Sequence, residues 1–415
     1  LVAALAVPVA AQTATTTEAE TTSVRTDILP GVELAVEEVE PGVFKILHDG
    51  VRDLAIGSPF HPSVFAGHDS SIWLVDDGRD GDDRPTGDGG FWRLGAPIEG
   101  WQQPARDARV GKVSVAPDGT VWVQDRRGDD PQLVDRLRSF DGESWTTHLR
   151  VPVEGASGLR AWTIAPDGTV VATYVDKGEE DRLAVSRLRD GAWESLGGPS
   201  TEPGWSDANV FATGSGDLWL VEGALGRGSD DVPYGGRLWD FREDDGWHEV
   251  PVDAVTSPIG GGGYEPSGQL EVGADGTVWF VGLEPRIADE ETSPWGGASF
   301  LMRFDGTEWE RWGRADDVPA LGYTAPFTLR QAPDGGLWMA TTVWDVRCSE
   351  QGVDRFDGSG WRRFLPGQCA GELDVAADGS VWLVAGTGGG FGQPQFGPTD
   401  WALYVITPEA VAGNE

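Results

Sequence analysis

A short pattern of apolar and polar positions, interrupted by a glycine turn, recurs along the chain. Its clearest copy is VAPDGTVWV at 115–123. Further copies occupy 164–171, 273–279, 332–338 and 376–382, and two less regular copies occupy 66–73 and 213–219. Each copy combines a β-branched run, a turn of the Asp-Gly type that accepts a positive φ, and a strand that in most copies carries tryptophan. The pattern therefore predicts seven β-hairpins.

A second hairpin follows most of these copies. It is marked by an Asp-Gly turn and then an aromatic residue, as in RSFDGESW at 138–145 and RFDGSGW at 355–361. Together the two hairpins make a unit of four strands, named A to D here in chain order. The unit repeats about every 51 residues between Trp73 and Trp382, within the range of propeller repeats. Four antiparallel strands repeated radially form a propeller blade, so we expect an all-β, seven-bladed β-propeller.

The two ends of the chain predict how the ring closes. Strand C of the last unit falls at 401–407, and a strand-like segment lies near 44–56. Because an unpaired sheet edge is a liability, we expect this N-terminal strand to supply strand D of the last blade. The propeller is thus expected over 32–407, followed by a C-terminal tail at 408–415.

The N-terminal residues predict export. The segment 1–11 is apolar and ends in small residues, as do the h-region and cleavage site of a secretory signal peptide. Residues 12–31 are rich in threonine and glutamate and are expected to form a flexible linker. No later run is long and apolar enough to span a membrane. We therefore expect an exported monomer, secreted or in the cell envelope.

The charge of the chain narrows the choice of partners. The formal net charge is −37 at pH 7, with only 31 Lys and Arg residues against 68 Asp and Glu residues. Binding to nucleic acid needs a basic face, so nucleic acid is excluded as a partner. An extracellular small molecule, a glycan or a protein is the expected ligand.

The repeat motifs carry a resemblance to known families. Glycines before strand C, as at Gly89-Gly90 and Gly235-Gly236, combine with Asp-Gly-x-hydrophobic-Trp in strand B. This combination resembles the propeller repeats of two-component-regulator sensor proteins and those of the virginiamycin B lyase family, over roughly 44–407. The resemblance implies the fold. In the sensor family the propeller accompanies a kinase; the lyase family uses histidine chemistry with a metal, and its catalytic histidines have no residue-by-residue match here.

The connections between strands are unequal at the two faces of the predicted ring. The A–B and C–D turns are short, whereas the B–C loops and D–A links carry the long excursions, among them 222–236, 282–298 and 386–400. Binding residues concentrate in long loops on a rigid scaffold. We therefore expect this face to bind the ligand. Its candidate binding residues are aromatic side chains outside the repeat framework: Trp205, Tyr234, Tyr264, Trp295, Trp344 and Phe391.

Catalysis is the alternative function of this face. Asp76, Asp80, Asp82 and Asp83 form the densest group of acids in the long loops, and clustered carboxylates bind Ca²⁺ or Mg²⁺; a solvated acidic surface is the simpler interpretation. His61 lies on a D–A link and is the candidate catalytic residue. The acids of the Asp-Gly turns, by contrast, are expected to stabilise turns.

The chain contains two cysteines. Cys348 and Cys369 are placed on the same face and are expected to form a disulfide in an exported protein.

The preferred function is an exported binding or recognition module. The alternatives are a propeller lyase or hydrolase that uses loop carboxylates with a divalent cation, and a structural scaffold of the cell envelope.

Overall fold

The computed structural model describes most strands and turns of the chain and leaves out many connections between them. The described residues are 22–29, 31–47, 63–67, 71–76, 90–94, 108–127, 134–141, 143–152, 159–177, 181–199, 205–213, 216–224, 236–250, 269–273, 276–283, 299–305, 308–312, 328–340, 351–387 and 402–412.

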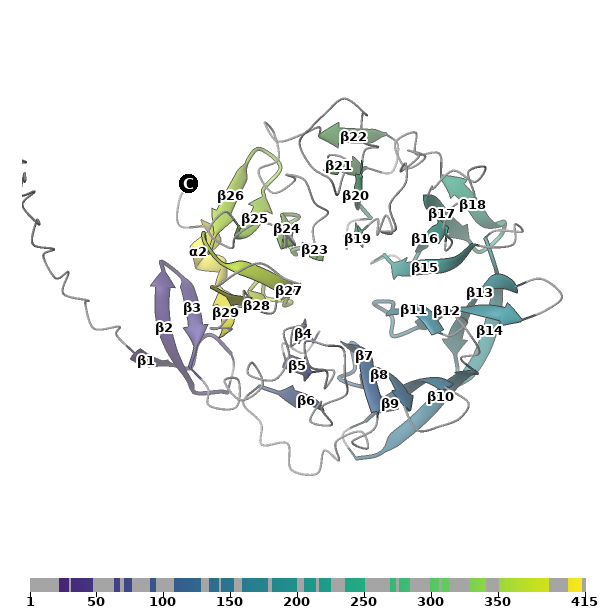
Figure 1. Cartoon of the computed structure of the whole chain (residues 1–415), viewed down its shortest axis with the longest axis horizontal. Helices are drawn as coiled ribbons and strands as arrows, with labels where there is room; N and C mark the ends of the chain where they lie inside the picture. Colours follow the sequence, from purple (N-terminus) through teal and green to yellow (C-terminus); the bar gives the residue numbers. More distant parts are fainter. Residues whose placement is uncertain are drawn as a thin grey trace, which may run out of the picture.

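The described residues form seven antiparallel sheets arranged around a common axis, which confirms the predicted β-propeller (Figure 1). Strands A lie nearest the axis: β4 (Ser63–Ala66), β7 (Ala108–Val115), β11 (Leu159–Ile164), β15 (Trp205–Ala212), β19 (Gln269–Val272), β23 (Thr328–Gln331) and β27 (Cys369–Val375). Strands B follow: β5 (Ile72–Asp76), β8 (Val121–Arg127), β12 (Val170–Lys177), β16 (Leu218–Ala224), β20 (Val278–Leu283), β24 (Leu337–Ala340) and β28 (Val381–Gly386).

Strands C and D complete the sheets outward. Strands C are β6 (Gly90–Arg93), β9 (Val134–Phe140), β13 (Asp181–Arg189), β17 (Gly236–Arg242), β21 (Ser299–Phe304), β25 (Val353–Phe356) and β29 (Ala402–Ile406). Strands D are β10 (Trp145–Pro152), β14 (Ala192–Gly197), β18 (Gly246–Val250), β22 (Trp309–Trp312), β26 (Trp361–Phe364) and β3 (Val43–Ile46). Six sheets thus contain the expected four-stranded blade, and the described part of the β4-β5-β6 sheet has three strands.

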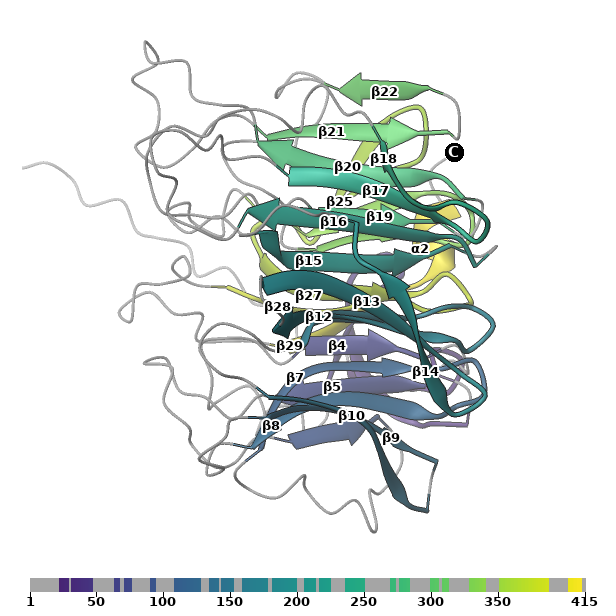
Figure 2. The same ribbon diagram turned by 90° about the vertical axis from the view of Figure 1, so that its right-hand side faces the viewer.

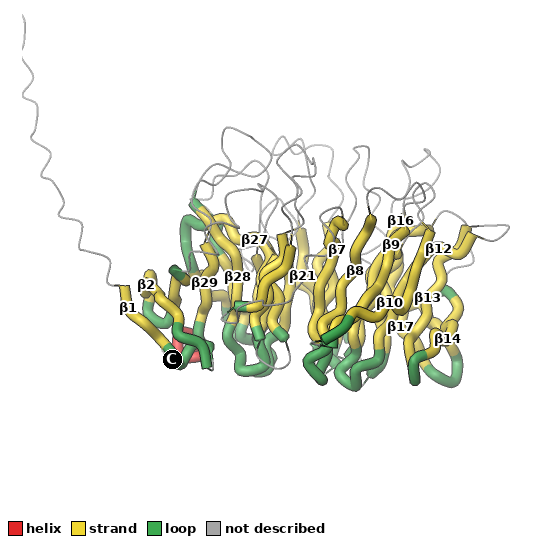
Figure 3. Tube along the Cα trace, turned by 90° about the horizontal axis from the view of Figure 1, so that it is seen from below, coloured by secondary structure: helices red, strands yellow, loops and turns green. Residues whose placement is uncertain are grey.

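The A–B hairpins share one turn geometry. In the β7–β8 hairpin, the amide of Ala116 donates to the carbonyl of Thr120 at 2.8 Å and Gly119 has a φ of 84°. The Asp118 carboxylate accepts from the amide of Thr120 at 2.9 Å. Only glycine adopts this φ without steric cost, which explains the Asp-Gly pair. The same short turns recur around one end of the ring, called the short-turn end below (Figure 3).

The tryptophans of strands B pack between blades, as the repeat predicts. Trp382 of β28 is 1% exposed and shares a cluster with Val64 and Ile72 of the next blade. Trp338 of β24 likewise packs with Leu373 of the following blade. Large aromatic rings bury much apolar area per residue. These interfaces therefore hold neighbouring blades together around the ring.

The N-terminus closes the last blade, which confirms the predicted shared sheet. β3 pairs with β29, so that Lys45 lies opposite Tyr404 and Phe44 opposite Val405. The closing strand covers Val43–Ile46, at the start of the segment expected to supply it. The chain thereby joins its first and last described elements in one sheet.

Two additional strands extend this sheet, and one of them, β1 (Thr22–Arg25), lies within the expected linker 12–31. β2 (Leu34–Glu40) and β1 lie outside β3, so the last blade has six strands. The expectation of a flexible linker over 12–31 is corrected for its last part, because Ile28 and Leu29 are buried in the adjoining core. These two apolar residues supply the burial that the threonine-rich sequence before them lacks.

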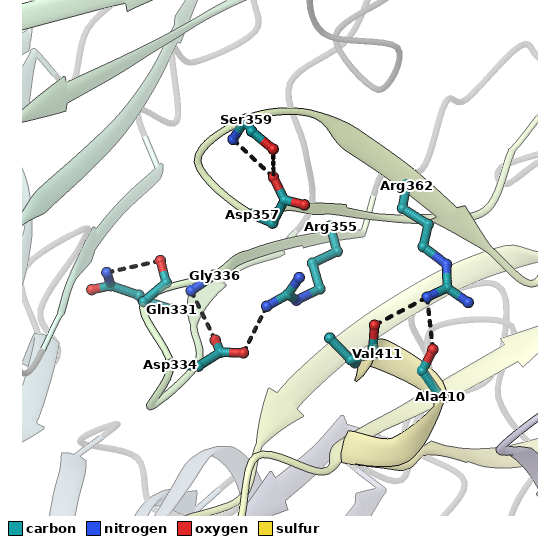
Figure 4. Close-up of polar contacts among 10 residues, drawn as sticks. Gln331, Asp334, Gly336, Arg355, Asp357, Ser359, Arg362, Ala410 and Val411 are labelled. Carbon is teal, nitrogen blue, oxygen red and sulfur yellow. Dashed lines mark hydrogen bonds and ion pairs between the residues drawn. The ribbon is translucent and has the colours of Figure 1, made fainter. Parts of the chain in front are cut away.

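The C-terminal residues form a short helix, α2 (Pro408–Ala412), rather than only a tail. Arg362 of β26 donates to the carbonyl oxygens of Ala410 and Val411 at 2.7 and 3.3 Å (Figure 4). α2 lies at the short-turn end, beside the last blade (Figure 2 and Figure 3). The helix thus fixes the C-terminal end of the described chain to blade six.

Candidate functional site

The site residues predicted from the long loops lie almost entirely outside the described part of the chain. Those outside it are His61, Asp80, Asp82, Asp83, Tyr234, Tyr264, Trp295, Trp344, Phe391 and Cys348. Trp205 is the first residue of β15, and Asp76 is the last residue of β5, where it lies opposite Gly90. Both therefore lie at strand ends away from the short turns. The binding, catalytic and metal roles of this set remain predictions.

The acids of the Asp-Gly turns stabilise turns, as expected. Asp334 accepts from the amide of Gly336 at 2.9 Å and forms an ion pair with Arg355 of β25 at 2.7 Å (Figure 4). Asp357 accepts from the amides of Ser359 and Gly360. These hydrogen bonds to backbone amides and to the Ser359 hydroxyl lower the pKa of Asp357 to about 2. Such carboxylates are committed to the backbone and are poorly suited to proton transfer.

The structure brings together a group of charged side chains that the sequence did not single out. Lys112 lies on β7, Glu271 on β19, Arg330 on β23, and Glu372 and Asp374 on β27. We call these five residues the inner charged cluster, because all belong to strands nearest the axis. Except for Lys112 and Glu372, each is two positions before the first residue of its A–B turn, and therefore near the short-turn end.

Arg330 connects three consecutive blades within this cluster. Its Nε donates to Asp374 Oδ1 at 3.1 Å, and its Nη1 lies 3.7 Å from Glu271 Oε2. The carboxylates are also held by backbone amides: Asp374 Oδ2 accepts from Ala66 of β4 at 2.8 Å, and Glu271 Oε1 accepts from Gln331 at 3.2 Å. The network therefore links the blades that begin with β19, β23, β27 and β4.

Lys112 extends the cluster to the other side of β4. Its ammonium donates to the carbonyl oxygen of Trp162 at 2.7 Å and lies 5.2 Å from the centre of the Trp162 ring. The indole of Trp162 in turn donates to the side chain of Gln124 at 3.1 Å. These contacts fix the ammonium between β7 and β11, and no carboxylate in the described part of the chain forms an ion pair with it.

The electrostatic surroundings shift the protonation of this cluster. Desolvation by the surrounding protein raises the pKa of Glu271 to about 7, against the opposing attraction of Arg330. Desolvation also lowers the pKa of Lys112 to about 8, and the nearby positive charge of Arg330 acts in the same direction. For Arg330 desolvation opposes the charge, but Asp374 and Glu271 together raise its pKa above the ordinary value.

Solvent reaches the cluster, although protein surrounds it. The Arg330 side chain is 36% exposed, that of Asp374 20% and that of Glu271 17%, and Lys112 is exposed. Residues on innermost strands of a filled core would be buried instead. Charged groups that are both solvent-accessible and desolvated, with shifted pKa values, are typical of functional sites. The cluster can donate hydrogen bonds, accept them and exchange protons near neutral pH.

The sequence contained a signal for this cluster. Glu271, Arg330 and Asp374 occupy the same position relative to the repeated turn, where Ser114 and Thr163 stand in other units. Charged residues that share one position of the repeat are expected to lie at the same level of the ring, on neighbouring blades. The expectation that the long connections alone carry function overlooked this position, since it belongs to the strand framework.

Comparison with known proteins leaves the family of this chain open. No known family matches the chain. The resemblance to sensor propellers and virginiamycin B lyases therefore extends to the β-propeller fold alone. A lipoprotein of Streptomyces coelicolor, LpqB, is 27% identical over 156 residues, which cover 37% of this chain and 23% of LpqB. The matched stretch thus spans about a quarter of that relative.

Among solved structures, two are similar to this chain over most of its length, with low TM-scores. The β-propeller domain of the Trilobed protease from Pyrococcus furiosus has a TM-score of 0.47 at 11% identity and covers 85% of this chain and 92% of its own. An α-L-arabinanase of Penicillium chrysogenum has a TM-score of 0.44 at 12% identity, covering 71% of this chain and 92% of its own. Likeness at these identities concerns the fold alone. The helices that the structure describes include none long and apolar enough to cross a membrane.

Proposed function

We propose that this chain is a ligand-binding β-propeller of the cell envelope, and that it binds an extracellular small molecule, glycan or protein at the end of the ring opposite the short turns. The observation that carries the proposal is the difference in length between the connections at the two ends of the ring. The described A–B turns are tight and alike. At the other end, the chain uses 225–235 between β16 and β17, 284–298 between β20 and β21, and 387–401 between β28 and β29.

Long connections on a closed scaffold vary without disturbing the strands, so they are the usual carriers of binding residues. The aromatic candidates Trp295 and Trp344 belong to such connections. Association with the cell envelope is supported by the apolar segment 1–11 and by the similarity to a protein named as a lipoprotein. A seven-bladed ring of four-stranded units is part of the same proposal, with the fourth strand of the β4-β5-β6 sheet assigned to the residues that follow β6.

A screen of glycans and peptides with the full chain tests the proposal. We expect a ligand whose binding is weakened by Trp295→Ala or Trp344→Ala and is unchanged by Asp244→Ala, an exposed position in the β17–β18 turn at the short-turn end. Equal loss of binding in all three variants, or a ligand insensitive to both tryptophans, would refute the assignment of the face. If none of the tested glycans and peptides binds, the result would favour the scaffold alternative.

A lyase or hydrolase is the second candidate, and the observation that favours it is Glu271. A carboxyl group with a pKa of about 7 is suited to general acid–base catalysis at neutral pH. The divalent cation of this alternative is expected at Asp76, Asp80, Asp82 and Asp83 with His61, of which only Asp76 is described. Asp76 lies at the strand end away from the short turns, so such a cation would serve a site separate from Glu271. Melting the protein with and without EDTA, followed by addition of Ca²⁺ or Mg²⁺, tests this candidate: a metal that binds the folded state raises Tm, and an unchanged Tm removes the metal-dependent reaction.

A further inference from the structure

Two opposite charges of the inner charged cluster form no ion pair with any residue that the structure describes. Within the described residues, the ammonium of Lys112 donates to the carbonyl oxygen of Trp162. Glu372, which is half-buried on β27, forms neither a hydrogen bond nor an ion pair with any residue that the structure describes. Lys112 is exposed and Glu372 is half-buried, so solvent reaches both groups although protein surrounds the cluster. Here both lie on strands nearest the axis and stay apart.

The two charges nevertheless act on each other. Among the carboxylates near Lys112, Glu372 has the largest effect in raising the pKa of the ammonium, ahead of Asp374 and Glu271. Glu372 also acts on Arg330. Lys112 and Glu372 therefore share one region, but the distance between them exceeds that of an ion pair.

The ring itself keeps them apart. Lys112 belongs to β7 and Glu372 to β27, and β4 lies between these strands, in contact with both (Figure 1). The positions of all three strands are fixed by their own sheets. A long side chain could cross this gap only by giving up its existing contacts, as Lys112 would lose the carbonyl of Trp162. The arrangement thus preserves a positive and a negative group that face a common space.

Arg330 and Phe65 add two further features to that space. The Nε and Nη1 of Arg330 are engaged by Asp374, Leu329 and Glu271, whereas its Nη2 contacts no acceptor among the described residues and adds a second donor. Phe65 lies on β4, the strand between β7 and β27; its ring packs against the cluster that contains Val113 and Val115 and is only partly buried. The region therefore presents cationic donors, an anionic acceptor and an apolar surface.

We propose that the inner charged cluster binds a small zwitterion, an α-amino acid with an apolar side chain. Its carboxylate is placed between Lys112 and Arg330, its ammonium against Glu372, and its side chain against Phe65. A simple anion would gain the cations but meet Glu372 and Asp374, and a simple cation would meet Lys112 and Arg330. Only a ligand with both charges pairs with both sides, since unpaired desolvated charges are costly. This site lies on the strands nearest the axis, with Lys112 and Glu372 in the middle of β7 and β27, and does not depend on the ligand proposed for the end that carries the long connections.

Calorimetric titration of the full chain with three matched probes tests the proposal. The probes are L-leucine, 4-methylpentanoate, which lacks the amine, and isopentylamine, which lacks the carboxylate. We expect L-leucine to bind about tenfold or more tightly than either fragment, because charge-assisted hydrogen bonds form at both ends. The proposal would be overturned, before any variant is made, if the three probes bound equally tightly or if L-leucine did not bind.

Variants then locate the site. Lys112→Met and Glu372→Gln are each expected to weaken L-leucine binding about tenfold or more. Lys45→Met is the matched control, since Lys45 is a half-buried lysine on β3, away from the strands nearest the axis. Tm and near-ultraviolet circular dichroism confirm that each variant is folded. If folded Lys112→Met and Glu372→Gln bind L-leucine as the wild type does, the inner charged cluster is not the site.

Discussion

Arg330 of β23 and Asp374 of β27 join neighbouring blades through a contact of 3.1 Å between Nε and Oδ1, and the same aspartate accepts the amide of Ala66 from the blade beyond. One carboxylate thus receives hydrogen bonds from two different blades. Blade-to-blade packing elsewhere depends on apolar side chains such as Trp382. Near the axis, the polar contacts of a few strand residues supplement it.

Removal of Arg330 is expected to destabilise the ring. Arg330→Met leaves Asp374 and Glu271 without their cation, and a stranded, partly desolvated carboxylate costs more than a lost surface pair. We expect a decrease of about 1–3 kcal/mol in the free energy of unfolding, measured by urea denaturation. Arg242→Met is the control, because Arg242 pairs with Asp240 but is 60% exposed, and exposed pairs contribute about 0–1 kcal/mol. Equal effects of the two substitutions would contradict the bridging role.

Glu271 is expected to make stability depend on pH. Its pKa is about 7 in the folded protein and about 4.5 when unfolded. The folded state thus binds the proton more tightly, so this contribution is fully present below pH 4.5 and is lost as the pH rises through 7. Glu271→Gln, which stays neutral, should therefore gain stability relative to the wild type between pH 5 and 8. Denaturation curves of both proteins at each pH measure the difference; a constant difference would contradict the shifted pKa.

The titration of Lys112 measures how the surroundings in the inner charged cluster shift the pKa of an ammonium group. The chain has three lysines, Lys45, Lys112 and Lys177, so NMR of protein reductively methylated with ¹³C gives a simple spectrum. The signal that disappears in Lys112→Met is assigned to Lys112 and should titrate near pH 8, since its pKa is lowered from 10.5 to about 8. Replacing the neighbouring positive charge, in Arg330→Met, should move this midpoint upward. A Lys112 midpoint at 10.5 would show that the ammonium is not desolvated.

Substitutions at two glycines of the closing blade allow the cost of backbone strain to be measured separately from the cost of steric contact. Gly42 has a φ of 73°, and a Cβ there would lie 2.6 Å from the Cβ of Ala410 in α2. Gly31 has a φ of 78° with no atom within 4 Å of such a Cβ. Gly31→Ala should cost about 1 kcal/mol from strain alone, and Gly42→Ala should cost about 1–3 kcal/mol more because α2 must move. Similar Tm values for the two variants would show that α2 is not held in place.

The cysteine pair remains a prediction that thiol titration can check. Cys369 is buried at the start of β27, and Cys348 lies outside the described residues. Protein prepared under oxidising conditions and unfolded in denaturant should show no free thiol before reduction and two afterwards. Cys348→Ser should lower stability by about 3 kcal/mol, as for a disulfide that closes a loop of this size. Two free thiols before reduction would refute the bridge.

The sequence predicted what is local and repeated. The Asp-Gly turn at Asp118 and Gly119 is specified by adjacent residues, and the spacing of Trp73 to Trp382 fixes the blades that these turns connect. Closure by β3 also followed from the pattern. The inner charged cluster could not be predicted in the same way, because Lys112 and Glu372 meet only when distant units are arranged in a ring. The strand β1 was missed, because its sequence is polar and lies outside the repeat. β2 falls within the expected propeller, but its place as an extra strand beyond β3 did not follow from the repeat.

The pairing of β3 with β29 also sets the order of events during synthesis. Residues 43–46 leave the ribosome well before their partner at 402–406, because the other blades of the ring lie between them in the sequence. Until then the N-terminal strands lack the strand that joins them to the ring, and the contact has one of the greatest sequence separations in the fold. Closure of such non-local pairs slows folding, and unpaired strand edges favour aggregation in the meantime. A newly made chain is therefore most vulnerable just before its last blade is complete.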